Sequence, residues 1–281
     1  MKLAEYLTSY IAAAFTGLWI TTSEADEAER EIVQQARSKK WKIAVWDVAN
    51  GLRLPGANPG STEAGAGDPL AALRALPALA DEKGTAILVL HNFHRFLSST
   101  EVVQAVFAQL VAGKQQRTFI VVLAPTAQIP VELEKLFVVI EHALPDRDQL
   151  ERIARELTSD HADDLPQGDD LQRVLDAAAG LTRYEAEGAF ALSLTRHNKF
   201  VPEVIWELKA QMLRKNNLLR LHQGNESFES LGGLPSLKSF CTRALQGGKP
   251  VKPRGVLLVG VPGSGKSCFA RALGNETGRP T

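Results

Sequence analysis

The sequence is poor in cysteine, in net charge and in long apolar runs, and each shortage excludes a class of protein. Two cysteines, Cys241 and Cys268, occur in 281 residues, which excludes a disulfide framework and favours a reducing compartment, the cytoplasm. Lys+Arg and Asp+Glu are both 32, so no overall field attracts nucleic acid or anionic lipid. We therefore expect no membrane partner and disfavour a nucleic-acid partner.

One apolar stretch, from Tyr10 to Ile20, needs a separate explanation. It has about half the length of a bilayer-spanning helix. It also lacks a basic leader, because Lys2 is soon followed by Glu5, and no convincing cleavage signal follows it. We interpret the stretch as the end of a buried helix that runs into a strand, and we expect no export.

The first half of the chain alternates apolar, β-branched runs with amphipathic segments. The expected strands are residues 17–23, 42–48, 85–90 and 118–124. Expected helices are 24–40, one from Pro69, and one capped by Ser98 with Glu101 that ends at Ala112, just before Gly113. Strands that alternate with helices imply crossover connections and a parallel sheet. The predicted fold class is therefore α/β.

From residue 145 onward the expected strands stop. Helical periodicity covers 146–158, 169–179, 182–196 and 202–221, and Thr182 with Glu185 forms a capping box. The character changes again near Gly224, toward loop, helix and one strong strand. A chain of 281 residues is more than one core needs, and we place the domains at 1–145, 146–222 and 223–281.

Two charge runs accompany the helical part. Residues 146–176 hold ten acidic and four basic residues, and residues 209–254 hold nine basic and two acidic residues. Solvated helix faces account for both runs. The alternative is a pair of complementary surfaces between neighbouring subunits.

The strongest motif lies near the C-terminal end. Gly260-Val-Pro-Gly-Ser-Gly-Lys266-Ser267 matches the phosphate-binding pattern G-x-x-x-x-G-K-[ST] in full. An apolar run at 255–259 precedes it as an expected strand, and a helix is expected from Ser267 to Ala272. Strand, glycine loop and helix N-terminus form the context that the motif requires. A glycine-rich turn with a surface lysine is the alternative.

Each residue type in the loop has a physical reason. Glycines let backbone N–H groups turn toward phosphate oxygens, and the following helix adds the positive end of its dipole. Lys266 places its charge between the β- and γ-phosphates, and the hydroxyl of Ser267 is offered to Mg²⁺. The expected cofactors are ATP and Mg²⁺, and the predicted phosphate site comprises Gly260, Val261, Pro262, Gly263, Ser264, Gly265, Lys266, Ser267 and Cys268.

With its flanking segments, this loop resembles the opening of an AAA ATPase module. The resemblance lies in Ser227-Phe-Glu-Ser-Leu-Gly-Gly-Leu234, Leu237-Lys238 and Lys252-Pro-Arg-Gly-Val-Leu-Leu-Val-Gly260. It implies that Leu231, Gly232 and Gly233 lie against the adenine, that the protein forms a homo-oligomeric ring, and that it remodels a protein client. The family's acidic strand motif, polar sensor and arginine finger would follow Thr281, so the chain is expected to be truncated after the P-loop.

The N-terminal part is similar to the same module in a degenerate form. Residues 119–125, 129–130 and 143–146 resemble the sensor strand and the turn into the helical lid, and 182–219 resembles lid helices. The whole pattern resembles bacterial and plastid AAA proteins that carry a degenerate N-terminal AAA-like domain.

The degenerate part lacks the residues for phosphate. Thr21-Thr22-Ser23-Glu24 replaces the P-loop, with no glycine and no lysine, and His91-Asn92 stands where paired acids would follow Leu90. Carboxylates at Glu24, Asp26 and Glu27 would face the phosphates, so we expect nucleotide binding here to be disfavoured.

Three functions follow from these motifs. The first is an ATP hydrolase of the AAA+ family that remodels a protein. The second is a nucleotide-binding scaffold that does not hydrolyse, and the third is a small-molecule kinase, for which the long N-terminal α/β part is atypical. Residues 1–281 by themselves are expected to bind nucleotide weakly and to turn it over negligibly, because the groups that stabilise the transition state would lie further on.

Overall fold

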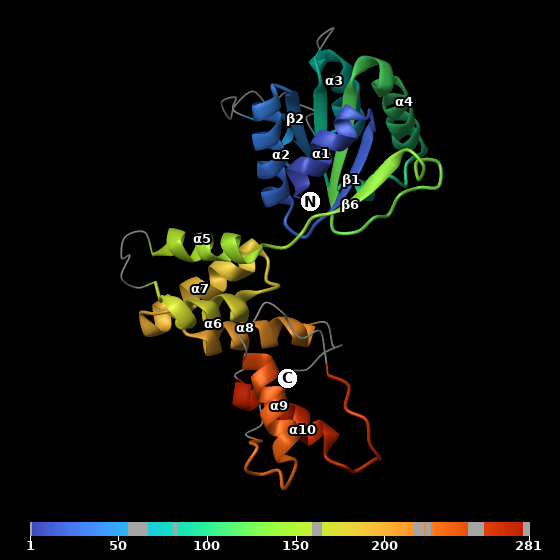
Figure 1. The fold of residues 1–281 in the computed structure, drawn as a ribbon. Coiled ribbons are helices and arrows are strands. Elements are labelled where there is room, and N and C mark those ends of the chain that lie inside the picture. The colour runs from blue at the N-terminus through green and yellow to red at the C-terminus, as the bar shows by residue number, and fades with distance from the viewer. Residues whose placement is uncertain are drawn as a thin grey trace. The chain divides into compact units, whose positions relative to one another are not determined.

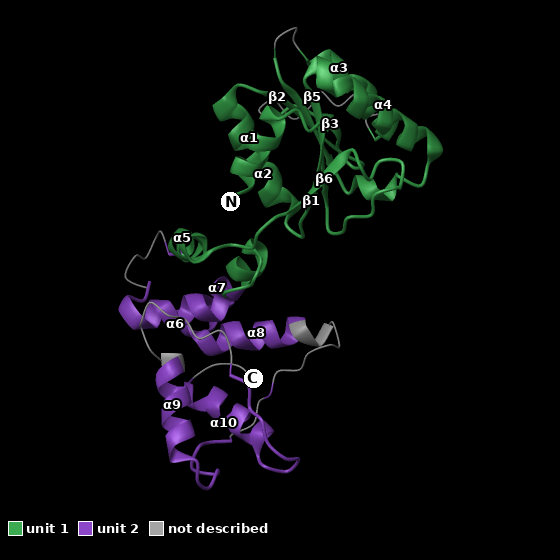
Figure 2. Ribbon diagram, turned by 45° about the vertical axis from the view of Figure 1, so that its right-hand side comes forward, with its two compact units in different colours: residues 1–157, 179–188 green, residues 158–178, 189–281 purple. Residues whose placement is uncertain are grey.

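The computed structural model describes residues 2–55, 67–80, 84–158, 165–215, 222, 226–246 and 256–277. The chain divides into two compact units (Figure 2): unit 1 contains residues 1–157 and 179–188, and unit 2 contains residues 158–178 and 189–281. Within the described ranges, no helix is both long and apolar enough to cross a membrane.

Unit 1 is built on a six-stranded sheet of order β3-β2-β4-β5-β1-β6. The strands are β1 (Gly17–Thr21), β2 (Lys42–Asp47), β3 (Gly51–Arg53), β4 (Ala86–His91), β5 (Thr118–Ala124) and β6 (Phe137–Glu141). Every neighbouring pair is parallel except β2 and β3, which form an antiparallel hairpin. This sheet confirms the α/β class and all four strands predicted in this part.

Helices cover both faces of the sheet (Figure 1). One core packs α1 (Leu3–Ala12) and α2 (Ala25–Lys39) against the sheet, and the other packs α3 (Pro69–Leu79) and α4 (Thr100–Gln116) on the opposite face. Successive strand residues alternate between the two cores: in β4, Ile87 belongs to the first and Leu88 to the second. Because both faces are dry, the central strands have no polar alternation.

Helix α4 differs from the prediction at both ends. It is preceded by Ser99, which makes no side-chain cap, so the predicted Ser98 capping box is wrong, and the helix runs past Gly113 to Gln116. Gly113 is needed for close packing, since an added Cβ would lie 2.3 Å from the backbone oxygen of Thr118. A glycine at a close backbone approach resembles a helix stop in sequence.

Two strands, β3 and β6, were not predicted. In β6 only Phe137 and Ile140 are buried, so the strand has neither a continuous buried run nor strict alternation. It is recognisable mainly through its parallel register with β1, in which Gly17 pairs with Phe137. Pairing between distant segments decides such an edge strand.

The helical part matches the prediction closely. Its helices are α5 (Arg147–Leu157), α6 (Gly168–Ala178), α7 (Arg183–His197) and α8 (Pro202–Lys215). The capping box is confirmed, because Thr182 N donates to Glu185 Oε2 at 2.9 Å and Glu185 N donates to Thr182 Oγ1 at 3.2 Å. Residues 216–221 of the last predicted helix, and residues 56–66, lie outside the described residues.

Unit 2 contains α6, α8 and the C-terminal helices α9 (Pro235–Gln246) and α10 (Lys266–Thr277). The ammonium group of Lys209 on α8 donates to the carbonyl of Ala177 at 2.8 Å and lies 4.3 Å from the Trp206 ring centroid. Burial lowers the pKa of Lys209. This lysine therefore fastens α8 to the C-terminal end of α6, where a cation is favoured by the helix dipole.

Candidate functional site

The predicted phosphate loop leads directly into a helix. Residues 262–265 form turns and α10 begins at Lys266. Gly263 and Gly265 have φ angles of 82° and 81°, a backbone region that residues with a Cβ rarely adopt. Residues 260–265 are exposed, so the loop backbone is open to a ligand.

Lys266 is folded onto this loop. Its ammonium group donates to the carbonyls of Gly260 and Val261, both at 2.8 Å, and lies 3.3 Å from the hydroxyl of Ser264. All three acceptors belong to the loop itself. The positive charge is thus held inside the segment that contains the two glycines at positive φ.

The strand expected before the loop is not formed. Described residues 256–260 carry no strand, and Leu257 and Val259 are 88% and 86% exposed. The prediction of a strand here is therefore wrong for the described residues. A strand exists only beside a partner, and the six strands of the described sheet pair with one another within unit 1.

The P-loop helix is fastened to the segment before α9. The rings of Phe228 and Phe269 stack with centroids 5.6 Å apart. Phe228 N donates to Glu276 Oε1 at 3.0 Å, and Asn275 Nδ2 donates to the carbonyl of Glu226 at 2.8 Å. Phe269 lies one helical turn after Lys266, so these contacts hold the beginning and the end of α10 against one segment.

A charge cluster supports the same junction. Glu226 lies 2.6 Å from Nε2 of His222 and 3.4 Å from the guanidinium of Arg271 on α10. The hydrogen bond from His222 is the main cause that lowers the pKa of Glu226.

The segment predicted to contact the base follows Phe228. Gly232 and Gly233 are exposed, and Gly233 and Leu234 have positive φ angles of 74° and 57°. The backbone here turns sharply before α9 begins at Pro235. Both predicted groups of site residues therefore lie in unit 2, linked through Phe228 and Phe269.

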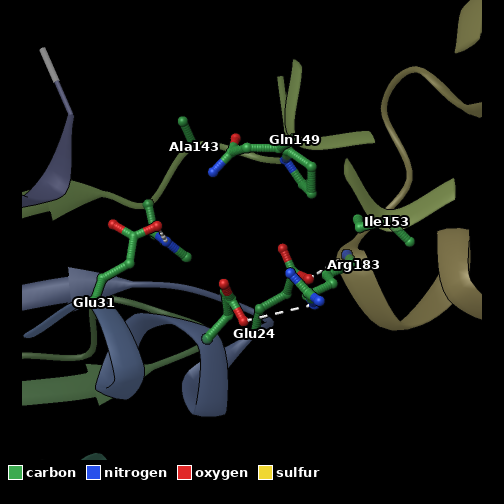
Figure 3. A pocket seen from close by; sticks show the side chains of 9 residues that line it. Glu24, Glu31, Ala143, Gln149, Ile153 and Arg183 are labelled. Atoms are coloured by element: carbon green, nitrogen blue, oxygen red, sulfur yellow. Dashed lines mark hydrogen bonds and ion pairs between the residues drawn. The ribbon is translucent and has the colours of Figure 1, made fainter. Parts of the chain in front are cut away.

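In unit 1, the end of β1 is where a phosphate loop would stand, and its chemistry is different. A small pocket there is lined by Glu24, Glu27, Glu31, His142, Ala143, Pro145, Gln149, Ile153 and Arg183 (Figure 3). Thr22 Oγ1 lies 2.9 Å from Nδ1 of His142. The backbone N–H of Arg183 donates to the carboxylate of Glu24, and burial raises the pKa of that carboxyl.

Among the described residues, Arg183 is the one guanidinium that lines this pocket, and carboxylates surround it. Glu156 lies at 2.6 Å, Glu187 at 2.8 Å and Glu27 at 3.9 Å. These groups neutralise the cation, and Glu24 takes the backbone N–H at the start of α7. Sequence reasoning identified the acidic residues but missed Arg183, whose role depends on a contact across 159 positions.

At the end of β4, a histidine, an arginine and a carboxylate form a second charged cluster. Glu29 Oε2 lies 2.8 Å from His91 Nε2, and both oxygens of Glu29 accept from Arg53, at 2.8 and 2.7 Å. Burial alone would raise the pKa of Glu29, but the hydrogen bonds from His91 and Arg53 lower it to about 2. Glu29 is therefore held as an ion-paired carboxylate at the end of β4.

Two family models match the chain. Residues 3–142 match the N-terminal domain of SpoVK-like AAA ATPases, and residues 148–216 match the second domain of the same group. The chain belongs to the SpoVK-like AAA ATPases within the AAA+ family.

Curated relatives agree with this assignment. A protein named uncharacterized AAA domain-containing protein ycf46 from Trieres chinensis is 26% identical, over 98% of this chain and 57% of its own length. The protein of the same name from Guillardia theta is 24% identical, over 96% of this chain and 54% of its own length. The chain thus spans about half the length of the curated relatives it matches.

Among solved structures, the AAA domain of FIGL-1 in complex with ADP is 14% identical, with a TM-score of 0.45, over 71% of this chain and 72% of that one. A RuvB variant from Thermotoga maritima is 14% identical, with a TM-score of 0.47, over 99% of this chain and 81% of that one.

Proposed function

We propose that this protein binds ATP with Mg²⁺ at the loop 260–268 of unit 2. The carrying observation is the conformation of the loop: two glycines at positive φ, followed by a helix whose first residue is a lysine. Backbone N–H groups of Gly260, Val261, Gly263, Ser264, Gly265, Lys266, Ser267 and Cys268 would hold the phosphates, with Pro262 shaping the turn.

The residues fit a polyphosphate on geometric grounds. An added Cβ at Gly260 would lie 3.0 Å from Ser264 Oγ, so a side chain there would have to displace the Ser264 hydroxyl. Ser267 is exposed at the first turn of α10, where its hydroxyl would hold Mg²⁺. Lys266 needs only to exchange loop carbonyls for phosphate oxygens. Bound ATP would supply the phosphoryl group that is transferred to water.

The base would lie against Leu231, Gly232 and Gly233. This part of the proposal rests on the family resemblance and on the contacts between Phe228 and α10. The exposed glycine backbone supports it, because a planar base can approach a chain without side chains.

The full-length protein, on this proposal, hydrolyses ATP and remodels a protein client as a homo-oligomeric ring in the cytoplasm. The domains are proposed at 1–145, 146–222 and 223–281, with the first acting without nucleotide. A nucleotide-binding scaffold is the second candidate, favoured by the acidic lining of the pocket in unit 1.

Calorimetric titration with Mg-ATP tests the binding site. Lys266→Ala is expected to weaken binding at least about tenfold, because the ammonium is a charge-assisted phosphate ligand. Lys199→Ala, an exposed lysine of the same unit, is the control and should bind like the parent. Equal affinity in Lys266→Ala and the parent would overturn the proposal.

A further inference from the structure

Lys238 makes an unusual set of contacts for an α9 lysine. Its ammonium group donates to two main-chain carbonyls, that of Phe228 at 2.7 Å and that of Leu231 at 2.5 Å. It also lies 5.6 Å from the Phe228 ring centroid. The side chain is half-buried, and the helix begins only three residues earlier, at Pro235.

The turn also has two backbone hydrogen bonds of its own. Ser230 N donates to the carbonyl of Ser227 at 3.2 Å, and Leu231 N donates to that of Phe228 at 3.3 Å. A hydrogen bond from a charged donor is about twice as strong as a neutral one. Lys238 therefore contributes strongly to the shape of the turn from Phe228 to Leu231.

The same turn has two further connections. On one side, Phe228 stacks on Phe269 of the P-loop helix. On the other side, the chain continues into Gly232 and Gly233, which are exposed and have no side chain to fix their position. The Leu231 carbonyl bound by Lys238 is the last anchored group before these glycines.

We infer that Lys238 is a positioning residue that holds the Leu231–Gly233 backbone relative to the P-loop helix α10 and so sets the affinity for the base of the nucleotide. The inference rests on the proposed function and adds to it a residue that touches neither base nor phosphate. Since the phosphates are held by the loop and α10, Lys238 should matter for ATP and not for a polyphosphate that lacks a base.

The test compares two ligands, Mg-ATP and Mg-tripolyphosphate, by calorimetry on the 281-residue chain. Lys238→Met keeps the apolar stem and removes the donors. It is expected to lower the affinity for ATP about tenfold, while the affinity for tripolyphosphate changes less than about twofold. Lys238→Arg should recover ATP affinity to within about threefold, because a guanidinium also donates to two acceptors. Lys199→Met serves as the control.

If folded Lys238→Met lost affinity for both ligands equally, Lys238 would only support the fold in general, and the inference would be overturned. An unchanged affinity for ATP would overturn it as well. If Lys238→Met fails to fold, Lys238→Gln, with a neutral donor, must show a loss confined to ATP. If the parent protein binds tripolyphosphate and ATP with equal affinity, the inference is wrong but the proposed function stands. A parent that binds neither ligand sinks the proposed function and the inference together.

Discussion

The carboxylate of Glu29 on α2 lies 2.8 Å from Nε2 of His91 at the carboxyl end of β4. Arg53 of β3 completes the cluster with two hydrogen bonds to the same carboxylate. The resemblance to the AAA module implies a pair of acidic residues directly after this strand. Here a histidine occupies the position, and its partner is a carboxylate from a neighbouring helix, so the cluster stabilises unit 1.

Acid should destabilise unit 1 through Glu29. Its pKa in the folded protein is lowered to about 2 from an ordinary 4.5, so its contribution to stability is complete above pH ~4.5 and is lost as the pH falls toward 2. Glu29→Gln is expected to cost about 2 kcal/mol at pH 7 and less at pH 3, as measured by urea unfolding.

Glu132→Gln is the control for this prediction, since Glu132 is exposed. A Glu29→Gln protein that loses the same stability at both pH values would contradict the role of the ionised carboxylate.

Arg183 should support the fold and not nucleotide binding. Arg183→Ala leaves Glu156, Glu187 and Glu27 without their shared cation, and these partly exposed pairs are expected to contribute about 1 kcal/mol together. Thermal unfolding should show the loss, while the affinity for Mg-ATP should equal that of the parent.

Lys266→Ala provides the reverse comparison, because it should change the unfolding temperature little and lower the affinity for Mg-ATP strongly. If Arg183→Ala lowered ATP affinity as much as Lys266→Ala does, the pocket of unit 1 would have to be counted as a nucleotide site.

Two helical glycines should respond oppositely to alanine. At Gly113 the new Cβ would meet the Thr118 carbonyl at 2.3 Å, whereas at Gly188 in α7 no atom lies within 4 Å. Gly113→Ala is expected to cost about 1–3 kcal/mol through overpacking. Gly188→Ala is expected to stabilise by about 0.5–1 kcal/mol through helix propensity.

Urea unfolding of both variants measures the difference. A stabilised Gly113→Ala protein would mean that α4 and β5 separate easily at this point.

Residues 1–281 are expected to hydrolyse ATP at a rate close to background in a phosphate-release assay. Ground-state contacts at the P-loop bind phosphates, but turnover needs groups that stabilise charge in the transition state, and the resemblance places these after the P-loop. Steady hydrolysis that disappears in Lys266→Ala would show that the chain already contains them.

The sequence by itself determined the elements whose signals are local. Continuous apolar runs gave β4 and β5, because a strand buried on both faces has no polar alternation. Pro69 marked the start of α3, and the structure adds a cap in which the Leu70 N–H donates to the Asp68 carboxylate. The phosphate loop was recognisable because it needs glycine at positions with positive φ angles, which other residues rarely adopt.

The tertiary structure alone decided the features that depend on distant partners. Edge strand β6 exists through its register with β1, and Gly113 lies inside α4 because the Thr118 backbone is close. The contact from Arg183 to Glu24 joins residues 159 positions apart. The apolar run at 256–259 shows the converse, since its strand pattern is present but no described strand pairs with it. Local chemistry fixes which conformations are possible, and long-range contacts select among them.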